Sequence, residues 1–90
     1  MTTKTKIIFT KHAEDKFAVL LRHKVKLSRS FVIKTVREPE LIDRSRLPLL
    51  IAQRRFDANR VLRVVYKKEE DRLKIITFYP GRRSQYEKNR

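Results

Sequence analysis

The second half of the chain consists of three apolar runs of strand length, separated by two short polar connections. The runs cover residues 49–56, 61–67 and 72–79, and they are rich in β-branched and aromatic residues. The connections, 57–60 and 68–71, have the length of hairpin loops. Consecutive strands joined in this way favour an antiparallel sheet, and this constrains the fold more than any other feature of the sequence.

The first half predicts one more strand and two helices. Residues 6–10 form a short β-branched and aromatic run, and Thr10 can cap a helix whose apolar residues recur at helical spacing. Ser28 or Ser30 can cap a second helix, which the Glu-Pro pair at 38–39 stops because the residue before proline avoids the α region. The sequence therefore predicts an α+β fold of order β-α-α-β-β-β, with the two N-terminal helices packed on one face of an antiparallel sheet.

The charge of the chain indicates a polyanionic partner. Lys and Arg number 24 against 10 Asp and Glu, which gives a formal net charge of +14. Because 40% of the residues are hydrophobic, we expect a folded domain with a strongly basic surface and not a disordered chain. The absence of cysteine excludes a disulfide framework, a thiol nucleophile and thiolate zinc sites.

The length of 90 residues predicts a single domain. We expect its core at about 6–79 and a basic C-terminal tail at 80–90. No apolar run is long enough to cross a bilayer, and the polar start at 1–4 lacks a signal-peptide core. These features predict a soluble, cytoplasmic protein.

The titratable residues show no metal-site pattern. The histidines His12 and His23 lack metal-ligand spacing, and Glu38, Glu40 and Asp43 are expected in a solvated loop. The single glycine cannot form a Gly-rich phosphate loop. We therefore expect no metal and no small-molecule cofactor.

The register of the last hairpin decides which side chains lie on the face of the sheet that the helices leave open. If 68–71 is a two- or four-residue loop, Arg63, Lys74 and Phe78 share this open face. Tyr79 then lies on the face that carries the helices. Because Arg63 and Lys74 stand among apolar side chains there, the open face is the candidate functional surface.

The register of the preceding hairpin brings a second arginine beside Arg63. A four-residue loop pairs Arg54 with Arg63, and a three-residue loop is expected to bring Arg55 there. Like charges directly opposite one another destabilise a sheet. Such a pair therefore either splays into solvent or binds one anion together.

Two further segments carry candidate functional groups. His12, beside Lys11 at the start of the first helix, can act as a general acid or base near neutral pH, or it can be an ordinary surface residue. The C-terminal segment alternates aromatic residues with arginine. Nucleic-acid bases can stack on such aromatic rings while the arginines bind the phosphates. The alternative for that segment is a frayed basic tail. Its residues are Tyr79, Arg82, Arg83 and Tyr86.

Several motifs resemble a widespread family of small uncharacterised proteins allied to the RelE/ParE-type toxins of toxin–antitoxin modules, with BrnT among them. The resemblance covers nearly the whole chain. The motifs are FTKHA at 9–13, VREPE at 36–40, LRVVY at 62–66 and IITFY at 75–79, followed by Arg82-Arg83 and Tyr86.

The resemblance implies a small sheet with two helices on one face. In the RelE-like branch it further implies a metal-independent endoribonuclease that cleaves messenger RNA, often on the ribosome, and an acidic antitoxin as partner. The expected mechanism is attack of a ribose 2′-hydroxyl on the adjacent phosphate, with His12 or Tyr86 as the base and arginines stabilising the phosphoryl charge. ParE-like relatives inhibit DNA gyrase, and a non-catalytic nucleic-acid-binding module explains the charge equally well.

The positions that match the family's site are Arg54 or Arg55, Arg63, Arg82, Arg83 and Tyr86, and the residues singled out above complete the candidate set. We expect catalytic roles for His12, Arg54, Arg63 and Tyr86. We expect RNA-binding roles for Lys11, Arg55, Lys74, Tyr79, Arg82 and Arg83.

Overall fold

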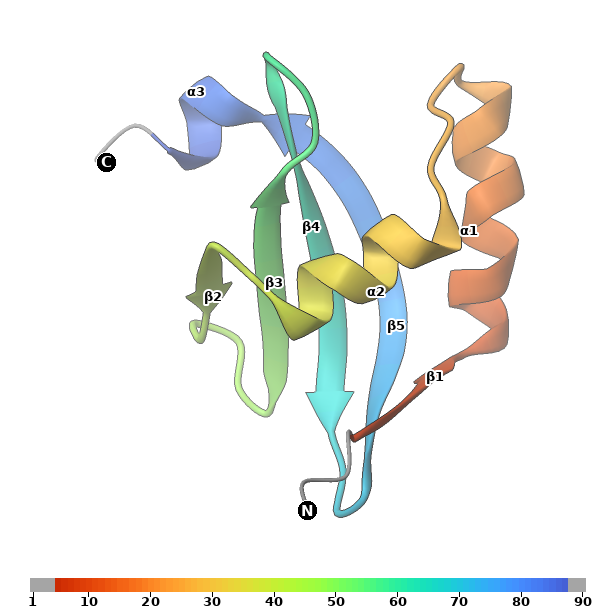
Figure 1. Ribbon diagram of the computed structural model, residues 1–90, viewed down its shortest axis with the longest axis vertical. Helices are drawn as coiled ribbons and strands as arrows, with labels where there is room; N and C mark the ends of the chain where they lie inside the picture. The colour runs from red at the N-terminus through yellow and green to blue at the C-terminus, as the bar shows by residue number, and fades with distance from the viewer. Residues whose placement is uncertain (1–4, 88–90) are drawn as a thin grey trace.

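The structure, a computed structural model, describes residues 5–87 and has the expected α+β order with two short elements added (Figure 1). The additions are a three-residue strand after the second helix and a four-residue helix at the C-terminal end. In chain order the elements are β1 (Lys6–Phe9), α1 (Lys11–Arg22), α2 (Arg29–Arg37), β2 (Leu41–Asp43), β3 (Leu49–Arg55), β4 (Arg60–Lys68), β5 (Arg72–Arg82) and α3 (Arg83–Tyr86).

The five strands form one sheet in the order β1-β5-β4-β3-β2. All neighbours are antiparallel except β1, which pairs with β5 in parallel. Helix α1 packs on β5 and helix α2 on β3 and β4, so both helices lie on the same face of the sheet (Figure 1). The fold class predicted from the sequence is confirmed, and the opposite face, here called the open face, is free of α1 and α2.

The predicted helix caps are confirmed. The hydroxyl oxygen of Thr10 accepts the backbone N–H of Ala13 at 3.1 Å, and the hydroxyl oxygen of Ser28 accepts that of Phe31 at 3.1 Å. Each bond satisfies an amide that has no partner within its own helix. The Thr10 hydroxyl also donates to the backbone carbonyl of Ile76 at 3.2 Å, which ties the start of α1 to β5.

The hydrophobic core lies between the two helices and the sheet. Phe78 of β5 is fully buried and its ring centroid lies 4.8 Å from that of Phe17 on α1. The buried core residues are Ala13, Leu20, Val32, Val36, Ala52, Leu62, Val64, Tyr66, Ile75 and Phe78.

No helix within residues 5–87 is long and apolar enough to span a membrane.

The predicted pairing of the last hairpin, with Tyr66 opposite Leu73, is wrong by two residues near the turn, which still leaves the side chains there on the predicted faces, and beyond Tyr66 the predicted faces are wrong as well. Tyr66 pairs with Ile75 on the core face, but a β-bulge between Val65 and Tyr66 then shifts the register. After the bulge Arg63 pairs with Tyr79. Since one extra residue reverses the side on which every later side chain lies, Phe78 enters the core and Tyr79 joins Arg63 on the open face.

The predicted pairing of Arg63 with Arg54 or Arg55 is wrong. Gln53 lies opposite Arg63, and Arg54 lies opposite Leu62 on the core side. The turn closes with the Phe56 N–H donating to the Arg60 carbonyl oxygen at 2.9 Å, so the loop has three residues, 57–59, and Arg60 already belongs to β4. This loop brings Gln53 to Arg63, not Arg55 as expected for a three-residue loop. No arginine pair therefore forms at the centre of the sheet.

Two segments expected to be irregular are ordered within the described residues. Leu41–Asp43, expected in a solvated loop with Glu38 and Glu40, forms the edge strand β2, because Leu41 and Asp43 pair with β3. The expected tail at 80–90 begins inside β5, which runs to Arg82, and continues as α3. The remainder of that tail, 88–90, and the polar start at 1–4 lie outside the described residues.

Candidate nucleic-acid interface

Arg63 occupies the centre of the open face and is only 6% exposed. Its Nε–H donates to the Tyr79 hydroxyl oxygen at 3.2 Å, Nη1 donates to Oε1 of Gln53 at 2.5 Å, and Nη2 donates to Oδ2 of Asp43 at 2.9 Å. The ring of Tyr86 covers the guanidinium, with its centroid 4.2 Å from Cζ. Hydrogen bonds in the plane and an aromatic ring above it fix the orientation of the cation.

Each partner of Arg63 reaches the cluster from a different element. Tyr79 and Gln53 are its direct cross-strand neighbours on β5 and β3. Asp43 comes from β2, where it pairs with Ile51 and therefore lies on the same face. The arginine–tyrosine cluster, meaning Arg63 with Tyr79, Tyr86, Asp43 and Gln53, thus depends on the register of three strand pairs.

Helix α3 places the Tyr86 ring over Arg63, and Gly81 makes room for it. A Cβ on Gly81 would lie 2.9 Å from Cδ2 of Tyr86 and closer still to Cε2, so any side chain would displace the ring. Glu87 ties helix α3 to strand β3, since its carboxylate accepts Nε–H of Arg83 at 2.7 Å and Nε–H of Arg55 at 3.2 Å. The single glycine is therefore needed for a close approach of an aromatic ring.

The charges in the cluster are fixed at neutral pH. Hydrogen bonds from the hydroxyl and backbone N–H of Ser45, and then from Arg63, lower the pKa of Asp43 to about 2. Burial disfavours the charged form of Arg63, but the bonds to Tyr79 and Asp43 outweigh burial and raise its pKa. The site therefore holds a permanent guanidinium beside a permanent carboxylate.

A hollow of about 440 Å³ opens beside the cluster, in the size range of small-ligand sites. Its wall combines an apolar floor with two aromatic hydroxyl groups and two arginines. Such a wall can accept a base against the aromatic rings and a phosphate against the cations. The lining residues are Asp43, Ser45, Arg46, Leu49, Ile51, Arg63, Val65, Tyr79 and Tyr86.

Of the candidate catalytic residues, the structure brings Arg63 and Tyr86 together and leaves the other two apart from them. Arg54 donates from Nη1 to the carbonyl oxygen of Glu38 at 2.6 Å, on the core side of β3. His12 is exposed on α1, which packs on the opposite face of the sheet from Arg63.

The candidate RNA-binding residues are dispersed. Tyr79 belongs to the arginine–tyrosine cluster, and Arg55 forms an ion pair with Glu87. Lys74 lies near the β4–β5 turn, 3.6 Å from Glu69. The remaining three are Lys11, exposed on α1 and 3.5 Å from Asp15, and Arg82 and Arg83, which line a second hollow at the end of the sheet.

Sequence reasoning missed Asp43 and Gln53. Gln53 is 2% exposed within a mostly apolar strand, and a polar residue in such a run signals a buried hydrogen-bond partner. Asp43 follows two apolar residues on a strand of three residues, which is too short to show the alternation of apolar and polar residues that marks a strand.

Residues 5–87 contain no group of three or more His, Cys, Asp or Glu side chains placed to hold a metal ion.

The fold and the cluster together define a small, basic α+β protein with an oriented arginine and two tyrosines on the open face of its sheet. No family model and no curated protein matches the chain. Among solved structures, the conserved hypothetical protein HP0894 from Helicobacter pylori is similar, with a TM-score of 0.52 and 19% sequence identity. The match covers 87% of this chain and 96% of HP0894. At this identity the likeness concerns the fold, which is consistent with the RelE-like arrangement.

Proposed function

We propose that this protein is the toxin of a type II toxin–antitoxin module, a metal-independent endoribonuclease that cleaves messenger RNA in the cytoplasm. The observation that carries the proposal is the oriented Arg63 guanidinium between Tyr79 and Tyr86, beside a hollow of nucleotide size. The net charge of +14 supports a polyanionic substrate and an acidic antitoxin as partner.

Arg63 stabilises the phosphate in this mechanism. Three of its five N–H donors are used by Tyr79, Gln53 and Asp43, so two remain for phosphate oxygens. A preorganised cation of this kind stabilises the charge that develops on phosphorus, and the loss of one such group costs on the order of 10²–10³ in rate.

Tyrosine side chains move the protons. Tyr86, in contact with Arg63, acts in its phenolate form: it takes the proton of the ribose 2′-hydroxyl and becomes a neutral phenol, and the 2′ oxygen bonds to phosphorus. The bond from phosphorus to the 5′ oxygen breaks, and that oxygen receives a proton from the Tyr79 hydroxyl. The products are a 2′,3′-cyclic phosphate and a 5′-hydroxyl end. His12 has no part in this mechanism because it lies on the other side of the sheet.

One observation favours a second candidate, a non-catalytic nucleic-acid-binding module. Asp43 already neutralises Arg63, which is buried beneath Tyr86, as in a purely structural ion pair. Binding would then depend on the exposed arginines and would weaken steeply with salt without forming a product.

The test is to map RNA 5′ ends after induced expression in a bacterial host. Tyr86→Phe keeps the ring on Arg63 and removes only the hydroxyl group, so we expect the new ends of the wild type to disappear. His12→Ala is the control and should leave them unchanged. The absence of new ends from a well-expressed wild-type chain would favour the binding module.

A further inference from the structure

Helix α3, which carries Tyr86, is too short to hold a position of its own. It consists of four residues, has no side-chain cap at its start and contains no buried residue. An isolated helix of this length is unstable in water. The place of the Tyr86 ring over Arg63 therefore requires contacts between α3 and the rest of the chain.

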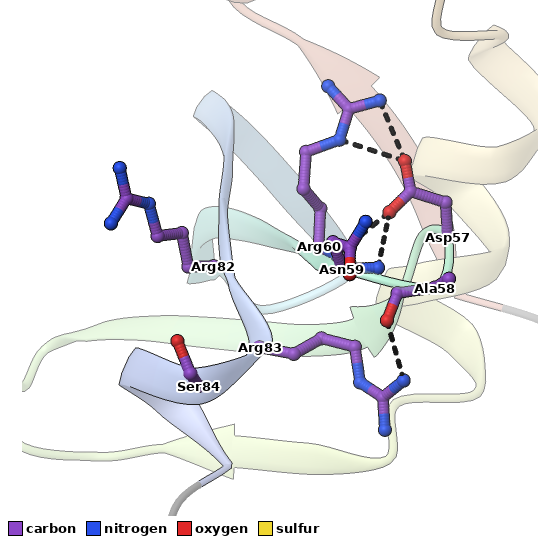
Figure 2. Close-up of a pocket in the computed structure, with 7 residues that line it drawn as sticks. All are labelled: Asp57, Ala58, Asn59, Arg60, Arg82, Arg83 and Ser84. Atoms are coloured by element: carbon purple, nitrogen blue, oxygen red, sulfur yellow. Dashed lines mark hydrogen bonds and ion pairs between the residues drawn. The ribbon is translucent and has the colours of Figure 1, made fainter.

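Arg83 attaches the start of α3 to the β3–β4 turn. Its backbone N–H donates to the carbonyl oxygen of Asn59 at 2.8 Å, and its Nη1 donates to the carbonyl oxygen of Ala58 at 2.9 Å. Figure 2 shows the Arg83 side chain reaching from α3 to Ala58, whereas Arg82 extends away from the other residues drawn. These two bonds leave Nε–H of Arg83 for a third partner.

That partner is Glu87, at the other end of α3. One carboxylate oxygen accepts Nε–H of Arg83 at 2.7 Å, and the other accepts Nε–H of Arg55 on β3 at 3.2 Å. The side chain is only 13% exposed. The hydrogen bond from Arg83, and then that from Arg55, lowers the pKa of Glu87, so the carboxylate is charged at neutral pH.

The bridge from Arg83 through Glu87 to Arg55 closes over the part of the open face on which α3 packs. Arg55 lies opposite Val61 of β4, and Val61 is fully buried there. Gly81, the neighbour of Val61 on β5, is the residue against which the Tyr86 ring packs. The two arginines of the bridge therefore hold α3 to the sheet and to the turn at the same time.

We propose that Glu87 is a positioning residue for Tyr86. Its bridge between two arginines keeps the tyrosine ring on the guanidinium of Arg63. The inference rests on the proposed function, because this is the place from which Tyr86 takes the proton of the ribose 2′-hydroxyl. Arg55 then serves the reaction through Glu87 and not by contact with RNA.

Glutamine at position 87 separates the bridge from the mere size of the side chain. Its amide has one acceptor oxygen in place of two, carries no charge and turns an N–H donor toward one of the arginines. Because Glu87 directly follows Tyr86 in the chain, loss of the bridge should move the residue that carries the ring.

The test follows the tyrosine rings by fluorine NMR in the free protein labelled with fluorotyrosine. The chain has three tyrosines, and single Tyr→Phe variants identify their resonances. Glu87→Gln should move the Tyr86 resonance toward its position in the urea-unfolded chain, and Arg55→Gln should move it in the same direction. The resonance of the buried Tyr66 should stay in place, which shows that the variants are folded.

Cleavage of RNA gives a second readout that a purely structural role would not produce. Glu87→Gln should lower kcat about tenfold and leave KM nearly unchanged, because a displaced base weakens the chemical step more than binding. In the Tyr86→Phe background it should cause no further loss, since Glu87 acts only through the Tyr86 hydroxyl group. Equal losses in the two backgrounds would argue against the proposal.

The matched control is Glu69→Gln. Glu69 also pairs with two cations, Arg72 at 2.8 Å and Lys74 at 3.6 Å, but it lies at the β4–β5 turn, at the opposite end of β5 from α3. An unchanged Tyr86 resonance in Glu87→Gln, or an equal shift in Glu69→Gln, would overturn the proposal. The spectra are recorded without RNA, so failure of the proposed function is recognised separately, as a wild-type chain that does not cleave RNA.

Discussion

At the scale of single residues, Arg63 is the side chain on which the open face depends. Its planar guanidinium meets three acceptors in different directions and a ring above, which the ammonium group of lysine cannot reproduce. The removal of these contacts would leave Gln53 and Asp43 without their cationic partner in a partly buried site.

Arg63→Lys should therefore lower the free energy of unfolding by about 1–3 kcal/mol and also abolish RNA cleavage. Urea denaturation of the purified variant measures the first effect. Arg54→Lys is the control, because Arg54 contacts only a backbone carbonyl oxygen in the described structure, and its loss should be clearly smaller. Equal losses would show that the contacts of Arg63 contribute little.

Asp43 should make the stability depend on pH in strongly acidic solution. Its pKa is about 2 in the folded protein against an ordinary value of 3.8, so the unfolded chain binds the proton first as the pH falls. The stabilisation is complete above pH 3.8 and is lost as the pH falls toward 2. In Asp43→Asn, we expect the acid-induced loss of unfolding free energy to be smaller by on the order of 1–2 kcal/mol.

Urea unfolding at a series of pH values below 5 tests this expectation. Asp15→Asn removes a carboxylate whose partner Lys11 lies 3.5 Å away on the exposed surface. That variant should follow the wild-type pH dependence. The same acid dependence in the wild type and in Asp43→Asn would contradict the role given to Asp43.

At this scale three of the five residues of the cluster were candidates from the sequence. Arg63, Tyr79 and Tyr86 follow from charge, aromatic spacing and the family resemblance, although Tyr79 was expected on the other face of the sheet. Gln53 could not be predicted as a partner because its proximity depends on the β3–β4 register, which the turn at Asp57 sets. Asp43 depends on the pairing of the short strand β2 with β3. The expected arginine pair does not form because of the same turn, and the bulge decides the face of Tyr79 alone.

At the scale of secondary-structure elements, the bulge in β4–β5 is held by the start of α1. The Thr10 hydroxyl accepts from Ala13 and donates to the carbonyl oxygen of Ile76, which lies in the bulge region. The one hydroxyl group of Thr10 therefore caps helix α1 and also gives the carbonyl oxygen of Ile76, at the bulge, a hydrogen-bond donor.

Thr10→Val should lower the free energy of unfolding by about 1–2 kcal/mol, because it removes both hydrogen bonds and keeps the β-branched shape. Thermal or urea unfolding checks this, with Thr10→Ser as the conservative control that retains the hydroxyl. A Val variant as stable as the Ser variant would show that neither bond contributes.

Gly81→Ala should displace Tyr86 from Arg63, because the new Cβ would overlap the tyrosine ring. We expect changed ring resonances of Tyr86 in NMR spectra and a loss of RNA cleavage, with the unfolding free energy reduced by about 1–3 kcal/mol. Ser84→Ala, on the exposed side of α3, is the control. Unchanged Tyr86 resonances in Gly81→Ala would contradict the packing described for the ring.

The elements themselves were well predicted from the sequence. Periodicity and capping residues located both long helices, and the apolar runs located four of the five strands. The edge strand β2 and helix α3 were missed, because each has too few residues to show a period and is held by tertiary contacts such as the Arg63–Asp43 and Arg55–Glu87 ion pairs.

At the scale of the whole molecule, two functions are divided between the faces of one sheet. The helices and the core face supply stability, and the open face carries the oriented arginine and the hollow beside it. In the proposed function, the net charge of +14 attracts the polyanionic RNA and the arginine–tyrosine cluster cleaves it.

The most direct test of this account is incubation of the purified chain with a single-stranded RNA and its all-deoxy counterpart, in the presence of a chelator. We predict that the RNA is cut to 2′,3′-cyclic phosphate and 5′-hydroxyl ends, that the deoxy strand stays intact, and that Tyr86→Phe is slower by about 10²-fold or more. Cleavage of the deoxy strand, or intact RNA with the folded wild-type protein, would contradict the account.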